Sequence, residues 1–324
     1  MKAEKYLIGN EYRSSGETKD ITNPYSGEIV KKVFKSSKED IDEALGYLTE
    51  TFGKYRNTPT YQKVELLEKV SDKIAEKKEE LALLITTETG KPIKFSRVEI
   101  DRAILTFKLG AEESKRIEGE VMNLDLLKGS EGKMGIVKRF PAGVILAITP
   151  WNFPINLVAH KLSPALASGN TVLLKPASTS MVCGIELTKI IKEACDEMEL
   201  GFCPVNVVTS SGKEINEYLD DERVKLISFT GSSDVGWGIK KKAFKQKVSL
   251  ELGGNAGVIV DKDADVEKAV QKIIVGGFGQ AGQSCISVQR VFVHDDIIDG
   301  FRKKLIEETK KVKFGDPFDE NTMV

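Results

Sequence analysis

Five short apolar runs that alternate with helical segments constrain the fold more than any other feature of this sequence. The runs occupy residues 144–149, 171–175, 205–210, 225–229 and 248–252. Helical patterns fill the gaps between them, at 156–168, 180–196, 213–220 and 233–243. Such alternation is typical of βαβ units, in which crossover helices cover parallel strands. We therefore predict an α/β fold with a doubly wound parallel sheet that binds a nucleotide at the carboxyl ends of its strands.

The region before this sheet has a different pattern. The first 120 residues are predicted to be helical after a short opening. Ser37 and Asp40 have the spacing of a capping box at the start of the first helix. A long amphipathic stretch at 64–89 and a third helix at about 93–116 follow. These helices are interpreted as a scaffold.

Two further segments complete the chain. Residues 121–140 alternate around a Lys-Gly-Ser-Glu-Gly-Lys turn, which predicts a β-hairpin extension. After residue 254 the pattern predicts a second strand and helix unit. Its elements are a strand at 257–260, a helix at 266–281, a strand at 290–294 and a helix at 297–311.

The charge balance limits the classes of partner. Lys and Arg total 48 against 49 Asp and Glu, a formal net charge of −1. This balance argues against nucleic acid or an anionic membrane as a partner. No window approaches the roughly 18 consecutive apolar residues of a membrane span, and the amino terminus lacks the apolar segment of a signal peptide. We therefore expect a cytoplasmic protein that acts on a small molecule.

One cysteine is a candidate nucleophile. The four cysteines contain no C-x-x-C pair and there are only two histidines, so no metal site is expected. Cys285 follows a glycine-rich segment at 276–282, and glycines let the backbone and a substrate approach closely. An accessible thiol needs only a modest decrease of its pKa from about 8.5 to act as a nucleophile at neutral pH. Cys183, Cys195 and Cys203 have apolar neighbours in or beside helices and are interpreted as inert.

Two polar side chains follow strands at the predicted ligand edge. Asn152 lies between two prolines directly after the run at 144–149, and such rigid placement suits an oxyanion donor. Asn152 could equally be an ordinary helix cap. Glu251 ends the last run, where partial burial in a cleft would raise its pKa toward that of a general base. The alternative is a hydrogen-bonded glutamate with a structural role.

Two other strand ends are candidates for binding a cofactor. Ser232 lies in a Phe-Thr-Gly-Ser turn that opens a helix, and free N–H groups there can bind a phosphate. The G-x-G-x-x-G fingerprint is absent, so a plain capped helix stays an alternative. Lys175 ends the run at 171–175, where its ammonium group could bind a ribose or a phosphate, or could simply be solvated.

Taken together, these motifs resemble the NAD(P)-dependent aldehyde dehydrogenase superfamily. They occur in the family's order and spacing: Pro-Trp-Asn-Phe-Pro at 150–154, Lys-Pro at 175–176, Phe-Thr-Gly-Ser at 229–232, Glu-Leu-Gly-Gly at 251–254 and Gly-Gln-Ser-Cys at 282–285. The resemblance runs from Asn-Pro-Tyr-Ser-Gly at 23–27 to Gly-Asp-Pro at 315–317. It is closest to the branch that contains lactaldehyde, nonphosphorylating glyceraldehyde-3-phosphate and succinate-semialdehyde dehydrogenases.

The resemblance implies a role for each candidate residue. Cys285 would attack the aldehyde carbon, and the Asn152 amide with the Cys285 N–H would hold the oxyanion. Glu251 would activate the water that hydrolyses the resulting thioester. The family's cofactor contacts fall on Ile148, Trp151, Lys175, Gly212, Ser232 and Leu252.

Two departures from the family pattern affect the expected activity. Many NAD-preferring relatives have a glutamate where this chain has Ser178, so NAD or NADP is expected, with NADP tolerated or preferred. Family members also continue for more than a hundred residues beyond this sequence. The resemblance therefore implies a Rossmann-type nucleotide-binding domain at 1–120 and 141–250, a bridging and oligomerisation hairpin at 121–140, and the first part of an incomplete catalytic α/β domain at 251–324.

Three functions stay open on the sequence alone. The first is oxidation of a small aldehyde to its acid, by a homodimer or homotetramer at full length. The second is a CoA-acylating dehydrogenase, although those relatives generally lack the glutamate that is Glu251 here. The third is a fragment that binds a nucleotide without catalysis.

Overall fold

A five-stranded parallel sheet forms the centre of the protein in the computed structural model, which describes residues 2–324. Its strands are β8 (Val144–Ile148), β9 (Thr171–Lys175), β10 (Val205–Val207), β11 (Val224–Thr230) and β12 (Lys247–Glu251). They follow the order β10-β9-β8-β11-β12, and every neighbouring pair is parallel. The predicted doubly wound sheet is therefore confirmed.

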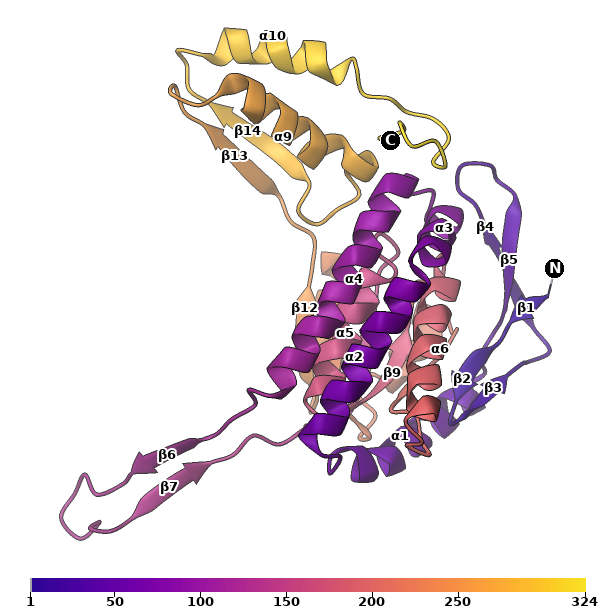
Figure 1. Ribbon diagram of the computed structural model, residues 1–324, viewed down its shortest axis with the longest axis vertical. Helices are drawn as coiled ribbons and strands as arrows, with labels where there is room; N and C mark the ends of the chain where they lie inside the picture. Colours follow the sequence, from indigo (N-terminus) through magenta and orange to yellow (C-terminus); the bar gives the residue numbers. More distant parts are fainter. Residues whose placement is uncertain (1) are drawn as a thin grey trace.

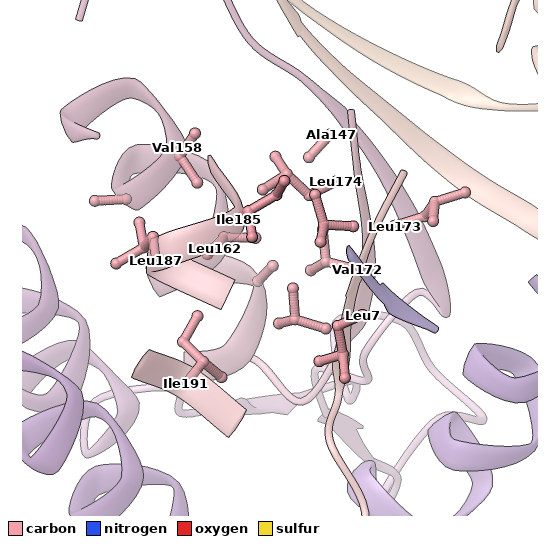
Figure 2. Close-up of a cluster of buried hydrophobic side chains, with 14 of the residues drawn as sticks. Leu7, Ala147, Val158, Leu162, Val172, Leu173, Leu174, Ile185, Leu187 and Ile191 are labelled. Carbon is pink, nitrogen blue, oxygen red and sulfur yellow. The ribbon is translucent and has the colours of Figure 1, made fainter. Parts of the chain in front are cut away.

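Two layers of helices cover this sheet (Figure 1). Helices α5 (Asn156–Ala167) and α6 (Met181–Glu197) contact the strands directly. Helices α2 (Thr60–Glu76) and α4 (Ile93–Ser114) pack on them in turn. The central strands β8 and β9 are buried along their whole length, which explains their continuous apolar sequence. Figure 2 shows part of this core, with labelled side chains of β8, β9, α5 and α6 and with Leu7 of β2 at one edge of the cluster.

The amino-terminal region contains more strand than the sequence predicted. Five short strands precede the first helix, in two small sheets that the predicted opening did not include. They are β1 (Ala3–Glu4), β2 (Tyr6–Ile8), β3 (Glu11–Arg13), β4 (Thr18–Thr22) and β5 (Ile29–Phe34). Strands of two to six residues are too short to produce a readable periodicity, and pairing between strands stabilises them instead.

The helical scaffold follows the prediction except at one break. Helix α1 (Lys38–Tyr55) begins with the expected capping box of Ser37 and Asp40. The predicted helix at 64–89 is two helices, α2 and α3 (Lys78–Thr89), which meet at Lys77. No buried apolar residue occurs between Ile74 and Leu81. A continuous apolar stripe that would hold both segments on one helix axis is therefore interrupted there.

Two further crossover helices are short. Helix α8 (Ser233–Lys242) agrees with the expected 233–243. The predicted helix at 213–220 consists of α7 (Gly212–Ile215) followed by a 3₁₀ turn, η1 (Asn216–Tyr218).

The hairpin and the second unit extend from different ends of the body of the protein, the hairpin at the lower left and the second unit at the top of the view (Figure 1). The hairpin pairs β6 (Glu120–Asn123) with β7 (Met134–Val137). The second unit contains the parallel strands β13 (Ala256–Val260) and β14 (Val288–Val293), with α9 (Val266–Phe278) and α10 (Ile298–Thr309). The predicted helix at 266–281 ends at Phe278, and a 3₁₀ turn, η2 (Gly279–Gly282), follows it. None of the helices in residues 2–324 has the length and apolarity needed to cross a membrane.

Candidate active site

The carboxyl ends of four strands form one edge of the sheet. Ile148 of β8 is paired with Lys175 of β9 and with Phe229 of β11, and Thr230 is paired with Glu251 of β12. After β10 the chain returns to the other side of β8, so the strand order reverses between β8 and β11. Ligands of open α/β sheets bind at such a switch point.

A cleft of about 350 Å³ lies at this edge. It is lined by loops that follow β8, β11 and β12 and by the loop that follows η2. Of the sequence candidates, the cleft brings together Trp151, Asn152, Ser232, Glu251, Leu252 and Cys285. Residues more than 130 positions apart in the sequence therefore face one small space.

Cys285 lies in this cleft after an unusual turn. Gln280, Ala281 and Gly282 have positive φ angles of 53°, 56° and 68°, in the left-handed region that residues other than glycine rarely adopt. Cys285 is exposed, whereas Cys183, Cys195 and Cys203 are buried. The expectation that only Cys285 is an accessible thiol is met.

The loop after β12 approaches Cys285 closely. A Cβ atom added to Gly254 would lie 2.7 Å from the carbonyl oxygen of Cys285. Because real Cβ atoms do not come so close to an oxygen, position 254 requires glycine. The absence of a side chain there lets the strand end that contains Glu251 lie beside the cysteine.

Asn152 is held against the cysteine loop by two hydrogen bonds. Its Nδ2 donates to the carbonyl oxygen of Gln283 at 3.0 Å, and its own backbone oxygen accepts from Nε2 of Gln280 at 2.6 Å. The side-chain amide has two hydrogens, so one stays available to a ligand. Gln280, whose side chain makes the second bond, is a residue that the sequence analysis missed, although it lies in the glycine-rich segment that was singled out.

Glu251 differs from the sequence-based expectation. Partial burial of its carboxylate was predicted, but the side chain is exposed. Strand β12 is the edge strand of the sheet, and its Lys247 and Ser249 are exposed as well. The carboxylate lines the cleft, but residues 2–324 do not enclose it.

Lys161 is a second residue that sequence reasoning missed. It lies on α5, is buried, and donates from Nζ to the hydroxyl of Ser228 at 3.0 Å. Burial lowers the pKa of Lys161 to about 8, while the negative charge of Glu251 opposes that decrease. A lysine on the apolar face of the predicted helix at 156–168 was the available signal.

The other cofactor candidates lie apart from the 350 Å³ cleft. Ser178 lines a second cavity of about 820 Å³, beside Ser211 and the amino-terminal residues 15–20. Lys175 is buried rather than solvated, and burial lowers its pKa to about 8. Ile148 is buried at the end of β8, and Gly212 begins α7. Ile148, Lys175 and Gly212 line neither cavity.

Two observations indicate that an anionic ligand fits this edge. Lys175 forms no ion pair with any carboxylate of residues 2–324, so its charge has no protein counterion there. Ser232 is the N-cap of α8 but its side chain makes no capping bond, which leaves the first N–H groups of α8 without that partner. Both features favour a ligand that carries phosphate.

Glu88, on α3, is a buried carboxylate that binds the start of α6. It accepts the N–H groups of Val182 at 3.0 Å and of Cys183 at 2.8 Å. Burial raises the pKa of Glu88 to about 7, against an ordinary value of 4.5, although these hydrogen bonds oppose the increase. No local pattern around residue 88 indicated that this glutamate binds the start of another helix.

The pKa of Glu88 predicts a pH dependence of stability. A pKa that is higher in the folded state means stabilisation that is complete below about pH 4.5 and is lost as the pH rises through 7. Relative to Glu88→Gln, the free energy of unfolding of the wild type should fall by about 2 to 3 kcal/mol between pH 5 and 8. Urea unfolding of both proteins at these pH values measures the difference. Parallel pH profiles would contradict the assignment.

Comparisons with known proteins all identify the same family. The sequence profile of the aldehyde dehydrogenase family matches residues 12–324. A 3-sulfolactaldehyde dehydrogenase of Priestia aryabhattai is 41% identical over 317 residues, covering 97% of this chain and 65% of the relative. A lactaldehyde dehydrogenase of Methanocaldococcus jannaschii is 41% identical over 309 residues, covering 95% and 65%. The chain thus spans about 65% of the length of these curated relatives.

Solved structures show the same similarity. Aldehyde dehydrogenase 21 of Physcomitrella patens, in complex with the reaction product succinate, has a TM-score of 0.95 and 38% identity, covering 99% of this chain and 66% of that chain. The glyceraldehyde-3-phosphate dehydrogenase GapN of M. jannaschii, complexed with NADP, has a TM-score of 0.89 and 40% identity, covering 95% and 67%.

Proposed function

Because the chain belongs to the aldehyde dehydrogenase family, we propose that the protein oxidises a small aldehyde to its carboxylic acid with NAD or NADP. The observation that carries this proposal is the meeting of Cys285, Asn152 and Glu251 in one cleft at the switch point of the sheet. A nucleophile, an amide donor and a carboxylate are the three groups that this chemistry needs.

In the first half of the proposed reaction, the Cys285 thiolate attacks the aldehyde carbon and forms a thiohemiacetal. The negative charge that develops on the oxygen is stabilised by the free hydrogen of the Asn152 amide and by the Cys285 N–H. The bond from Asn152 Nδ2 to Gln283 fixes the amide beside the cysteine before substrate binds. The nicotinamide cofactor, when bound, supplies the hydride acceptor that leaves a thioester on Cys285.

In the second half, Glu251 accepts a proton from water, and the water attacks the thioester carbon. The carbon–sulfur bond breaks, the acid leaves and Cys285 is free again. The exposure of Glu251 supports this role, because its carboxylate can reach bulk water and return the proton. Hydrolysis rather than transfer to CoA is favoured by the presence of this carboxylate.

For the cofactor, we propose that Lys175 and Ser178 contact the adenosine ribose and that α8 contacts the pyrophosphate. The uncapped N-terminus of α8 and the buried, unpaired ammonium of Lys175 support this placement. Ile148, Trp151, Gly212 and Leu252 are further proposed contacts. Ser178 has no negative charge, so a 2′-phosphate is accepted and NADP is tolerated or preferred.

The domain organisation is proposed on the same basis. Residues 1–120 and 141–250 would form the nucleotide-binding domain, and 251–324 would form part of the catalytic domain. The hairpin at 121–140 would bridge subunits of a homodimer or homotetramer. Its strands expose Val121, Met134 and Ile136, and such apolar side chains are suited to burial in a subunit interface.

The proposed function is tested by absorbance of the reduced nicotinamide. The chain, and the longer polypeptide if it belongs to one, is incubated with NAD or NADP and with lactaldehyde, glyceraldehyde 3-phosphate, succinate semialdehyde or glycolaldehyde. Aldehyde-dependent reduction without CoA is expected. Turnover only with CoA would favour the acylating reaction, and nucleotide binding without any turnover would favour a noncatalytic protein.

A substitution of Glu251 separates the two halves of the reaction. In Glu251→Gln the thioester should form but hydrolyse slowly, because the amide cannot accept the proton of water. We expect a burst of about one reduced cofactor per site, followed by a steady rate at least about 100-fold lower than that of the wild type. Stopped-flow absorbance measures both phases. Loss of the burst would count against the base role.

A further inference from the structure

The two helices that follow the binding loops begin without caps of their own. The N-cap of α5 is Ile155 and that of α6 is Ser180, and neither side chain makes a capping bond. Each helix start is instead bound by a buried glutamate from the amino-terminal scaffold. These are Glu99 of α4 for α5 and Glu88 of α3 for α6.

Glu99 contacts the helix start beyond the Asn152 loop. One of its carboxylate oxygens accepts the N–H groups of Ile155 at 2.8 Å and of Asn156 at 3.0 Å. The other oxygen is paired with Lys91, and neither side chain of this pair is exposed to solvent. The hydrogen bonds fix the end of the loop that begins at Thr149.

Lys91 contacts the same loop at a second point. Its ammonium nitrogen lies 3.9 Å from the centroid of the Phe153 ring, and Phe153 directly follows Asn152. A cation over an aromatic face is attracted to it, most strongly where water is excluded. The Lys91–Glu99 pair therefore binds the loop on the carboxyl side of Asn152 through a side chain and through the backbone.

Glu88 has the corresponding position on the cofactor side. It binds the first turn of α6 through Val182 and Cys183. That part of α6 packs tightly on the loop after β9, since a Cβ atom added to Gly184 would lie 2.8 Å from Pro176. Pro176 directly follows Lys175. The start of α6 thus packs against the loop that leads from Lys175 to Ser178.

We propose that Glu99 and Glu88 are positioning residues with separate effects, Glu99 on the oxyanion donor Asn152 and Glu88 on the cofactor residues Lys175 and Ser178. The proposal rests on the function proposed above. A catalytic group displaced by about 1 Å loses on the order of 100-fold in rate. Loosening the α5 start should therefore lower kcat, whereas loosening the α6 start should raise KM for the cofactor.

Paired variants distinguish the effect of losing the N–H acceptor from the effect of losing the buried charge. Lys91→Met with Glu99→Leu removes the ion pair and the acceptor, and Lys91→Met with Glu99→Gln removes the ion pair but keeps an acceptor of similar shape. We expect kcat at least about tenfold lower in the leucine variant than in the glutamine variant, with KM for NADP within about twofold. Relative to Glu88→Gln, Glu88→Leu should raise KM for NADP at least about tenfold and leave kcat within about twofold. Equal changes of kcat and KM in both pairs would overturn the proposal.

Hydrogen exchange tests the positioning without relying on turnover. Amide exchange measured by mass spectrometry should accelerate at Ile155 and Asn156 only in the double variant Lys91→Met with Glu99→Leu, and at Val182 and Cys183 only in Glu88→Leu. A uniform acceleration across the chain would mean lost global stability and would overturn separate positioning. If the variants show these local effects but the wild type has no aldehyde turnover, the proposed function fails and the positioning of the loops stands.

Discussion

Cys285→Ala is expected to lower aldehyde-dependent reduction of NAD or NADP by at least about 10³-fold while cofactor affinity stays within about twofold. Alanine cannot form the covalent thiohemiacetal, and no other thiol of residues 2–324 is accessible to replace it. Cofactor binding should persist, because the proposed contacts at Lys175, Ser178 and α8 do not include the thiol. Steady-state absorbance gives the rate, and quenching of the fluorescence of the two tryptophans, Trp151 and Trp237, gives the affinity.

A matched control uses one of the buried cysteines. Cys195→Ala changes a thiol on α6 that does not line the cleft, so its turnover should equal that of the wild type. Labelling with iodoacetamide under native conditions should modify one thiol in the wild type and in Cys195→Ala, but none in Cys285→Ala. Surviving turnover in Cys285→Ala would falsify the nucleophile assignment.

Lys91→Met should destabilise the fold by about 3 to 5 kcal/mol. The substitution leaves the Glu99 carboxylate buried without its cation, and water cannot reach it to compensate. Burial already lowers the pKa of Lys91, whereas the negative charge of Glu99 opposes that decrease by favouring the charged ammonium form of Lys91. Urea unfolding followed by circular dichroism measures the loss in the free energy of unfolding.

Two controls identify the cause of that loss. Lys91→Met with Glu99→Gln should recover much of the stability, because no unpaired charge is then buried. Lys245→Met breaks an ion pair with Glu222 in which both side chains are largely exposed, and the unfolding midpoint should hardly move. Equal losses in the free energy of unfolding for Lys91→Met and Lys245→Met would show that burial of an ion pair does not determine its contribution to stability.

The local patterns of the sequence predicted most elements of the fold. The boundaries of β9 and the start of α4 agree with the expected positions, as does the capping box at Ser37. Continuous apolar runs and amphipathic stripes are properties of neighbouring residues, so they can be read along the chain. The amino-terminal strands and the break at Lys77 were missed, because strand pairing and helix packing decided them.

The sequence by itself also determined which residues are candidates for chemistry. Cys285, Asn152 and Glu251 were recognised from their glycine and proline neighbours and their places after strands. The geometry of these residues followed from the tertiary structure alone. It leaves Glu251 exposed on the edge strand, buries Lys175, and places Gln280 against the Asn152 backbone.

The same distinction explains why the buried glutamates could not be predicted. Glu88 lies 94 positions before Val182, and Glu99 lies 56 positions before Ile155. In the sequence each is one more charged residue of an amphipathic helix. Only the packing of α3 and α4 against α5 and α6 removes water from these carboxylates and brings them to helix starts that have no caps. Burial and long-range pairing are properties of the assembled fold, and they are absent from the local order of residues.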